Sequence, residues 1–505
     1  MMALGIWPGH RLFEYERKLA QSELAAFGAT AIKPVPRGVQ FEHPAPRTLL
    51  GRLTYFSEIG VEGTVWPVAQ HEVEARHLQS RSIRSRQATR FGVHGFHEYK
   101  GKFNPQLARA LINAVDPDAV VLGDPFAGSG TALIEALRLG LDAHGRDRSP
   151  IAVFVSAAKL RAHQAGDPRR LAVELTELAE RVGASLKHGQ DTGSDASVPT
   201  WDATTHRYLS EWFTPPAFAG LREALSDHPP AEESPAAHLS LLALSSILRS
   251  VSLQEPQDLR VRRRPAGFVP PSLRDAYIET IDKFIASLAE LEPWTASQVA
   301  TSKLGNANDH DLFGDSKGRR LIVTSPPYAT ALPYIDTDRL SIMALGLATP
   351  ARTRELEASL TGSREWTMRA ARIWKQAMLD NAHSLPSEVT GLLGQIEAAN
   401  QANGAGFRRA AVPALLYRYF VAMRDDFTSW HGQLRRGERA VVVIGRNRTG
   451  PSGEQVTIET PSLLAACAEQ IGFTLGDVIS LETWPRYGMH AANAVNAEDA
   501  VVLEK

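Results

Sequence analysis

The stretch "AVVLGDPFAGSGTALIEALRLGLDAHGRD", residues 119–147, decides the fold of this chain. It opens with the apolar pattern of a buried strand and passes through two glycines into an apolar helical pattern, which Gly140 ends. A second strand pattern follows and ends at Asp147. A strand, a helix and a strand at this spacing form a βαβ unit, which places both strands parallel in one sheet. The sequence therefore predicts an α/β protein with a parallel sheet.

The loop "DPFAGSGT", residues 124–131, is a candidate ligand-binding turn. Gly128 and Gly130 tolerate positive φ and the close approach of a ligand, and the start of the following helix is electropositive. Asp147 follows at close to the roughly 20-residue spacing of a carboxylate that holds ribose hydroxyls. The dinucleotide fingerprint is incomplete because Leu133 replaces its last glycine, and the P-loop lysine is absent. A ligand with a ribose and no pyrophosphate fits best, and a tight turn without a ligand is the alternative.

The composition describes an ordinary soluble protein long enough for two or three domains, with 505 residues, 43% of them hydrophobic and 22% charged. The net charge of −1 means that any nucleic-acid surface must be local. The single cysteine, Cys467, excludes a disulfide framework and a Cys-rich zinc site, so no metal is expected. Because no apolar run reaches membrane-spanning length and no signal pattern opens the chain, we expect a cytoplasmic protein without membrane contact.

Three motifs together resemble those of the S-adenosylmethionine-dependent DNA amino-methyltransferases, the cytosine-N4 and adenine-N6 family. They are "DPFAGSGT" at 124–131, "GRDRSPIA" at 145–152 and "TSPPY" at 324–328. The segment "HEYKGKFNPQLARALI", residues 97–112, looks like the segment that flanks the cofactor in that family. The resemblance implies an α/β fold with a doubly wound, seven-stranded, Rossmann-like methyltransferase sheet, a helical insert and a small N-terminal α+β unit. It also implies S-adenosyl-L-methionine as the cofactor.

Four parts are expected along the chain. Residues 1–90 hold the N-terminal α+β unit and a basic connector, and residues 91–160 hold the cofactor-binding half of the methyltransferase domain. Residues 161–300 are a mostly helical insert that is a candidate for target recognition, and residues 301–505 hold the catalytic half. The last two strand patterns follow each other without a helix, which predicts an antiparallel pair at one edge of the sheet.

The resemblance assigns cofactor-binding residues one by one. It implies that Asp124 contacts the methionine amino group, that Phe126 packs on the cofactor and that Asp147 takes the ribose hydroxyls. Asn306, in "GNA", stands where Gly-Asp-Ala is usual, so it is expected to contact the adenine ring without the family's carboxylate. Ser149 is a mild departure, since Asn is commoner there. The loop expected to cradle the cofactor comprises Gly128, Ser129, Gly130 and Thr131.

The turn "SPPY" is the candidate catalytic corner: proline cannot continue a sheet ladder, so the preceding strand must end in a rigid turn. Methylation of an exocyclic amine is hard because the lone pair is delocalised into the ring. Two acceptors aimed at the amine hydrogens, the Ser325 hydroxyl and the Pro326 carbonyl, would hold the amine in line, with Pro327 stiffening the turn. Tyr328 is expected to stack on a base flipped out of the duplex. A packing turn is the alternative.

The choice of base is left partly open. Cytosine C5 methylation needs a nucleophilic cysteine, and Cys467 lies in a core-like helix pattern, so that chemistry is rejected. Serine at the first position of the catalytic corner resembles the cytosine-N4 group, whereas Asp or Asn is commoner for adenine N6. The N-terminal unit looks somewhat like the RNA-binding region of tRNA guanine-N2 methyltransferases, so RNA is the alternative to DNA. A nucleic-acid-binding protein with a decayed site is the third reading.

Two clusters of basic residues are candidates for contact with phosphates. They comprise Arg84, Arg86, Lys100 and Lys102 in the connector and Arg260, Arg262, Arg263 and Arg264 in "RVRRRP". Solvated, non-binding stretches are the alternative reading. Trp484 or Tyr487, between the last two strand patterns, is a candidate for the other wall of the base pocket, or a packing aromatic. A restriction or defence-system partner is kept as a candidate partner.

Overall fold

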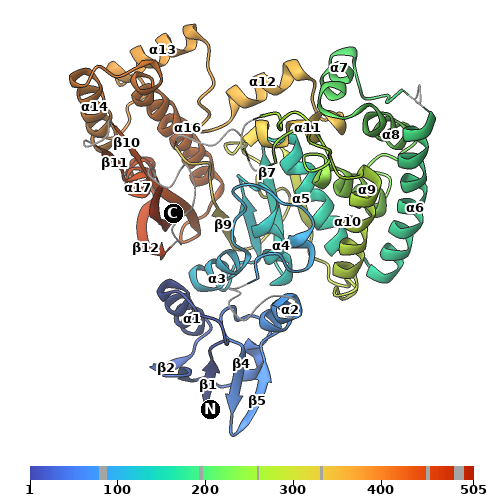
Figure 1. Ribbon diagram of the computed structural model, residues 1–505. Coiled ribbons are helices and arrows are strands. Elements are labelled where there is room, and N and C mark those ends of the chain that lie inside the picture. The colour runs from blue at the N-terminus through green and yellow to red at the C-terminus, as the bar shows by residue number, and fades with distance from the viewer. Residues whose placement is uncertain are drawn as a thin grey trace.

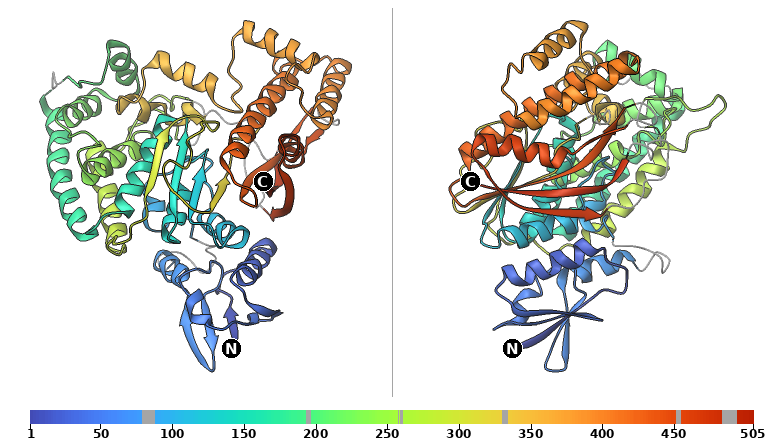
Figure 2. Two further views of the ribbon diagram at one scale, coloured as in Figure 1. Left: turned by 180° about the vertical axis from the view of Figure 1, so that it is seen from behind. Right: turned by 90° about the vertical axis from the view of Figure 1, so that its left-hand side faces the viewer.

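The computed structural model describes residues 1–78, 88–192, 197–256, 258, 261–329, 334–450, 455–482 and 494–505. The chain builds two sheets, and the larger lies at the centre with helices on both faces (Figures 1 and 2). Its main path has seven strands in the order β12-β13-β10-β9-β6-β7-β8, and β11 pairs with β10. The strands are β6 (Val121–Asp124), β7 (Asp142–Asp147), β8 (Ala300–Leu304), β9 (Arg320–Thr324), β10 (Arg439–Thr449), β11 (Val456–Ile458), β12 (Thr474–Glu482) and β13 (Ala494–Glu504).

The five strands from β8 to β10 along this path run parallel, whereas β13 and β12 are antiparallel to their neighbours. The antiparallel pair that the last two strand patterns predicted is therefore present, and β13 inserts between β10 and β12. The α/β class and the seven-stranded sheet implied by the resemblance are confirmed. Since parallel strands share one direction, the loops after β6, β7 and β9 meet at a single edge, where ligands bind in open α/β sheets.

Alternating residues along the central strands divide the core into two layers, as the two-residue period of a strand requires. Leu122 and Leu321 point into the cluster that holds α3 (Pro105–Val115), α4 (Thr131–Arg138) and α5 (Pro150–His163). Val121 and Ile322 point into the other cluster, with α16 (Val412–Gln433) and α17 (Thr460–Ile471). Strands buried on both faces explain why their sequences read as continuous apolar runs.

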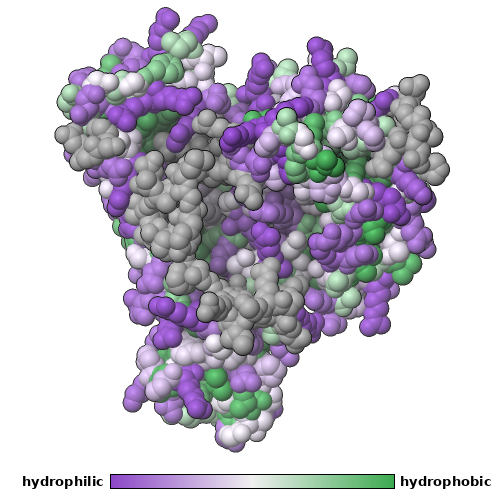
Figure 3. Space-filling model, viewed as in Figure 1, coloured by the Kyte–Doolittle hydropathy of each residue, from purple (hydrophilic) through white to green (hydrophobic). Residues whose placement is uncertain are grey.

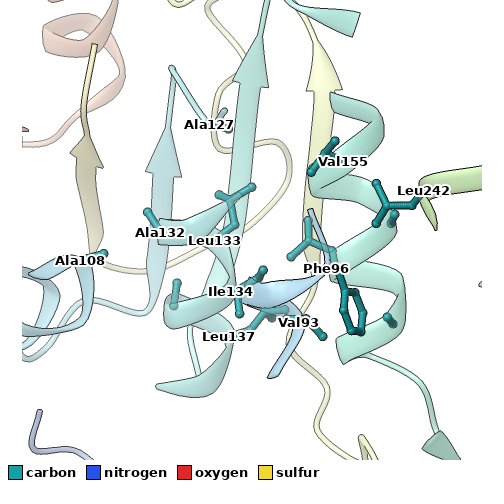
Figure 4. Packing of buried hydrophobic residues seen from close by; sticks show 14 of the residues in the cluster. Val93, Phe96, Ala108, Ala127, Ala132, Leu133, Ile134, Leu137, Val155 and Leu242 are labelled. Atoms are coloured by element: carbon teal, nitrogen blue, oxygen red, sulfur yellow. The ribbon is translucent and has the colours of Figure 1, made fainter. Parts of the chain in front are cut away.

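The first of these layers is built largely from small and branched side chains. Figure 4 shows Leu133, Ile134 and Leu137 of α4 beside the strands, with Val155 of α5 and Phe96 close by. Leu133, which spoils the dinucleotide fingerprint, is fully buried. It fills space against Gly145 of β7, where an added Cβ would lie 2.7 Å from a Leu133 methyl carbon.

The N-terminal unit is a five-stranded antiparallel sheet in the order β2-β3-β1-β4-β5 (Figure 1). It docks on α3, where the Arg109 guanidinium donates to the carbonyls of Gly51 (2.5 Å) and Arg52 (3.1 Å). Asn113 donates to Glu23 (2.8 Å). Its elements are β1 (Met2–Ile6), α1 (Glu14–Ala26), β2 (Thr30–Val35), β3 (Gly38–Glu42), η1 (Pro46–Leu49), β4 (Glu58–Val61), β5 (Thr64–Pro67) and α2 (Ala69–Leu78).

Helices fill the remaining chain and flank the main sheet on two sides. One group packs outside α5, where His238 contacts the Phe154 carbonyl at 3.0 Å. It comprises α6 (Pro168–Thr192), α7 (Ala203–Trp212), α8 (Pro215–Ser226), α9 (Pro235–Ile247) and α10 (Leu273–Leu288), after η2 (Gly92–Gly95). The other, between β9 and β10, comprises α11 (Tyr334–Ala344), α12 (Pro350–Ser359), α13 (Met368–Leu379), α14 (Ser387–Ala402) and α15 (Phe407–Ala410).

Two features of the strand assignment were wrong. The sequence shows mostly helical patterns between 151 and 300, and its next strand pattern is "RRLIV", yet β8 forms one edge of the sheet at 300–304. Its residues "ATSKL" are partly exposed and lack the apolar signature of the central strands. The stretch "LLGRLTYFSEIG", residues 49–60, has a strand-like pattern, but β4 begins only at Glu58, because the preceding residues form a 3₁₀ turn and irregular structure.

Among the described residues, no helix is both long and apolar enough to cross a membrane. On the face shown in Figure 3, hydrophilic residues cover most of the described surface, and hydrophobic residues are scattered between them. The division of the chain into four parts stays a prediction.

Candidate active site

The glycine loop and the "SPPY" turn are neighbours because β6 and β9 are adjacent parallel strands, with Gly123 opposite Ile322. Asp124 ends β6 and Thr324 ends β9. The Thr324 hydroxyl donates to Asp124 Oδ1 at 2.6 Å, so one hydrogen bond joins the two motifs. Thr324 belongs to the "TSPPY" motif, but no pattern in the sequence predicts this contact.

Asp124 is a buried carboxylate, 3% exposed, that receives no cation from the described chain. The Phe126 backbone N–H also donates to its Oδ1, at 3.2 Å. Burial, with a smaller contribution from the Asp147 charge, raises the pKa of Asp124 to about 7. A buried anion of this kind is stabilised by a cationic partner, which the ammonium group of a methionine moiety would supply.

The glycine loop has the backbone shape that the sequence predicted. Gly128 and Gly130 adopt φ of +49° and +77°. Gly130 is the N-cap of α4, and an added Cβ would lie 2.8 Å from Ser156 Cβ. The Ser129 and Thr131 hydroxyl oxygens are buried and have no hydrogen-bond partner in the described chain. Orphaned hydroxyls are costly, so they point to polar groups supplied from outside the chain.

We predict that Gly130→Ala lowers the free energy of unfolding by about 2–4 kcal/mol, because positive φ strain and overlap with Ser156 add together. Gly140→Ala is a matched control, since Gly140 has φ of +82° but nothing within 4 Å of an added Cβ. That control should show only the dihedral cost, about 1–2 kcal/mol. Urea unfolding measures both variants, and equal losses would contradict the predicted overlap.

Asp147 ends β7 at the same edge of the sheet. Its carboxylate accepts the backbone N–H groups of Gly128 and Ser149, both at 2.8 Å, which fastens the glycine loop to the next strand. Burial raises the pKa of Asp147 despite these two bonds. An ionised carboxylate has about four acceptor positions, so it can accept ribose hydroxyls as well.

Asn306 lies just after β8, beside Asp147, because the Gly305 N–H donates to the Asp147 carbonyl at 3.0 Å. Its side chain is exposed and already bonded within the chain. The Asn306 Oδ1 accepts from Arg148 Nε (2.7 Å), and its amide group donates to Asp309 (3.2 Å). The expected contact between Asn306 and the adenine ring stays a prediction. Arg148 and Asp309 already occupy the hydrogen-bonding groups of Asn306 that such a contact would use.

Phe126 faces an aromatic wall that the sequence did not identify. The ring of Trp430, on α16, meets the Phe126 ring edge to face with centroids 6.4 Å apart. Trp430 is fully buried and donates its Nε1–H to the Ala307 carbonyl at 2.8 Å. Helix α16 therefore covers the loop after β8, and no spacing in the sequence placed it there.

The catalytic corner is anchored from two further strands. Pro326 is buried, while Ser325, Pro327 and Tyr328 are partly exposed. The Tyr328 hydroxyl donates to Glu498 of β13, and its ring lies over Gly445 of β10, where an added Cβ would be 3.2 Å from the ring. Strand β13, which pairs antiparallel with β10, thus holds the ring expected to stack on a base.

The segment 97–112 lies against the glycine loop, as its likeness to a cofactor-flanking segment implied. An added Cβ at Gly128 would lie 3.3 Å from the ring of Tyr99. Residues 89–90, 94 and 97–104 line a cavity of about 380 Å³ beside this contact. Lys102 sits in it and donates to the carbonyls of Thr89 (2.7 Å) and His94 (2.9 Å). Burial, and then the Arg90 charge, lower the pKa of Lys102 to about 7.

The other basic candidates divide into exposed and packed residues. Arg262 and Arg263 are exposed, with Arg263 over the ring of Trp212 at 5.4 Å. Arg264 instead packs 3.9 Å from the Phe268 ring centroid and donates to the Gln254 carbonyl at 2.9 Å. Lys100 pairs with Glu98 at 2.8 Å. Arg84, Arg86, Arg260, Trp484 and Tyr487 lie outside the described residues.

The residues present fit S-adenosylmethionine. The buried Asp124 carboxylate, which has no cation beside it in the described chain, suits an ammonium group. The two left-handed glycines and the unpaired hydroxyls beside them leave room and hydrogen-bonding groups for a ligand. The Asp147 carboxylate, at the end of the next strand, suits a ribose. A cluster of three or more potential metal ligands is absent from the part of the chain that the structure describes.

Comparisons with known proteins support this interpretation. The family model of the RMKL-like methyltransferase domain matches residues 96–182. Type II methyltransferase M.MjaII of Methanocaldococcus jannaschii is 29% identical over 122 residues, which are 24% of this chain and 22% of that protein. Type II methyltransferase M.MvaI of Kocuria varians is 23% identical over 279 residues, 52% of this chain and 59% of that protein.

The chain thus spans less than two thirds of either relative. An rRNA methyltransferase structure from Streptomyces viridochromogenes covers 81% of this chain, and this chain covers 88% of it, at 10% identity and a TM-score of 0.27, too low for any conclusion. The resemblance to the amino-methyltransferases is confirmed by the family model and both relatives, which also imply S-adenosylmethionine as the methyl donor.

Proposed function

Since the chain carries a methyltransferase domain, we propose that it methylates an exocyclic amino group of a DNA base, cytosine N4 first and adenine N6 second. The observation that carries this proposal is the hydrogen bond from Thr324 to Asp124, which sets the catalytic corner beside the cofactor loop. Ser325 directly follows Thr324, the last residue of β9. Since Thr324 contacts Asp124 of the cofactor loop, Ser325 lies next to the proposed cofactor site.

The chain's own residues bind and position the reactants. The cofactor supplies an electrophilic methyl group when bound, so the protein needs no nucleophile of its own. The Ser325 hydroxyl and the Pro326 carbonyl accept the two hydrogens of the target amine and turn its lone pair toward the methyl donor. Tyr328 stacks on the flipped base, and Glu498 holds the Tyr328 ring in place.

The only cysteine supports the choice of an amine over cytosine C5. Cys467 is fully buried in α17, and burial raises the pKa of its thiol to about 12. A thiol that stays protonated and inaccessible cannot attack a pyrimidine ring.

Transfer of a tritiated methyl group from S-adenosylmethionine tests the substrate class. The proposal expects label in duplex DNA and none in tRNA. Label in tRNA alone would favour the alternative, a tRNA guanine-N2 methyltransferase, for which the N-terminal unit is the motivating feature. Absence of both transfer and cofactor binding would favour a nucleic-acid-binding protein with a decayed site.

We further propose that Arg262 and Arg263 contact DNA phosphates, since both are exposed. The segment around Arg249 lies near the connector, because Arg249 and Lys100 both lower the pKa of Glu98. Arg249 also donates to the Asp258 carbonyl at 2.6 Å, near the second basic segment, which supports the proposal that the two segments act together.

Reversing both charges, Arg262→Glu with Arg263→Glu, should weaken DNA binding at least about tenfold at 100 mM salt. It should also reduce the slope of log K against log salt by about 2, one phosphate for each arginine. Fluorescence anisotropy over a salt series measures both quantities. The control is Arg169→Glu with Arg170→Glu, two exposed arginines of α6 outside both basic clusters. An unchanged affinity and slope would remove the two arginines from the interface.

A further inference from the structure

Asp426 is a buried carboxyl group that the roles assigned so far do not use. It lies on α16 with 5% of its surface exposed, and its Oδ2 has no hydrogen-bond partner. Burial raises the pKa of this carboxyl well above its usual range. Because an unpaired buried carboxylate is costly, its presence calls for a donor that the chain itself does not provide.

The position of Asp426 on α16 faces the candidate cofactor site. Trp430 lies one helical turn later, on the same face, since residues four apart are neighbours on a helix. Trp430 is the ring that meets Phe126 and that donates to the Ala307 carbonyl after β8. Asp426 is therefore next to the wall that α16 presents to the glycine loop and the end of β8.

The position of Arg148 indicates which part of the cofactor would lie near Asp426. The Arg148 charge lowers the pKa of Asp426 against the larger effect of burial, so the two groups are close. Arg148 directly follows Asp147, the residue expected at the ribose, and bonds Asn306. The methionine end, by contrast, lies at Asp124 and Thr324. The group beyond the ribose in S-adenosylmethionine is adenine, whose exocyclic amine is a hydrogen-bond donor.

We propose, resting on the function proposed above, that Asp426 is a cofactor-binding residue that accepts a hydrogen bond from the exocyclic amine of the cofactor's adenine. Asn306 and Asp309, in the loop after β8, are already engaged with each other. Asn306 donates to Asp309 from both its backbone and its side chain, at 2.9 and 3.2 Å. Asp426 thus supplies, from a helix distant in sequence, the acceptor that position 306 lacks.

Binding of two nucleosides by the full chain tests the proposal without relying on activity. S-adenosyl-L-homocysteine carries the adenine amine, and S-inosyl-L-homocysteine has a carbonyl oxygen, an acceptor, at that position. Isothermal titration calorimetry of the unaltered chain should show a preference of about tenfold or more for the adenosyl compound, because the oxygen would face a carboxylate.

Asp426→Ala should reduce the preference to less than about twofold. Asp426→Asn should reduce or invert it, since an amide can donate to the inosyl oxygen. Both variants should melt at or above the temperature of the unaltered chain, because they remove an unpaired buried charge. Asp425→Asn is the matched control: Asp425 is the neighbouring residue on α16, its side chain is 48% exposed, and the preference should persist.

The outcomes separate this inference from the proposed function. If the unaltered chain discriminates between the two compounds and both Asp426 variants still do, Asp426 is not the acceptor, and loss of discrimination in Asp309→Asn would assign that role to the loop after β8. A marked fall in melting temperature for both Asp426 variants would show a structural role and overturn the inference as well. If the unaltered chain binds neither compound, the proposed function fails along with it.

Discussion

Ser325→Ala should lower the rate of methyl transfer about 100- to 1,000-fold while leaving the affinity for S-adenosylmethionine within about twofold of the unaltered chain. Removing one of two positioned partners of a reacting group typically costs this much, because the other partner cannot orient the group alone. The Ser325 side chain has no hydrogen-bond partner among the described residues, so its loss should not disturb the fold. Single-turnover transfer rates and equilibrium cofactor binding measure the two effects separately.

Ser325→Thr is the matched variant for this prediction, since it keeps the hydroxyl and should retain a measurable fraction of the rate. A Ser325→Ala chain that transfers methyl groups at the original rate would remove the hydroxyl from the mechanism. A chain that instead loses cofactor binding would place Ser325 in the cofactor site.

Asp124→Asn should weaken S-adenosylmethionine binding about 100-fold. The buried carboxylate then no longer faces the ammonium group of the methionine moiety, and hydrogen bonds between charged groups are worth about 1.5–3 kcal/mol. The Asn carbonyl oxygen can still accept from the Thr324 hydroxyl and the Phe126 N–H, so both local contacts persist. Calorimetric titration of the cofactor measures the loss.

The pH dependence of cofactor binding should distinguish the two chains. Burial raises the pKa of Asp124 to about 7, so below that pH the carboxyl is neutral and binds a cation poorly. Affinity in the unaltered chain should therefore rise as the pH increases through about 7, and Asp124→Asn should lack this rise. Since the folded pKa lies above the ordinary value of about 3.9, ionisation of Asp124 costs stability at pH 8, and the Asn variant should be at least as stable there.

Asp116→Asn is a control that should lower stability without changing cofactor affinity, the reverse of the effects expected for Asp124→Asn. Asp116 is also 3% exposed, but its carboxylate is paired with Arg319 at 2.7 Å. Its replacement should destabilise the fold and leave cofactor affinity unchanged, because the buried Asp116 carboxylate loses its pairing with Arg319, whose side chain is 39% exposed. An Asp124→Asn chain that lost stability and kept its affinity would contradict the proposed role of Asp124.

Much of the sheet could be predicted because its central strands are buried on both faces. The apolar runs that lead to Asp124 and Thr324 are continuous, and prolines follow both, while the strand that ends at Asp147 was predicted from its place after the glycine-opened helix. Strand β8 escaped prediction because it is a partly exposed edge strand, whose polar residues resemble a loop. Its place in the sheet depends on β7, and no local pattern encodes that pairing.

The candidate site was predictable where its residues are consecutive. Gly128 and Gly130 show the positive φ values expected of a ligand-binding turn. Contacts from distant elements gave no signal: Trp430 and Asp426 lie in a helix of ordinary amphipathic pattern, and Glu498 lies in the last strand. Such residues are brought to the site by packing of α16 and β13, which sequence periodicity does not specify.

Identification of the methylated nucleoside tests the central claim most directly. DNA incubated with the full chain and methyl-labelled S-adenosylmethionine would be digested to nucleosides and analysed by mass spectrometry. We predict labelled N4-methylcytosine, whereas N6-methyladenine would keep the amine chemistry and change the base. Labelled 5-methylcytosine, or DNA without any labelled base, would contradict the account.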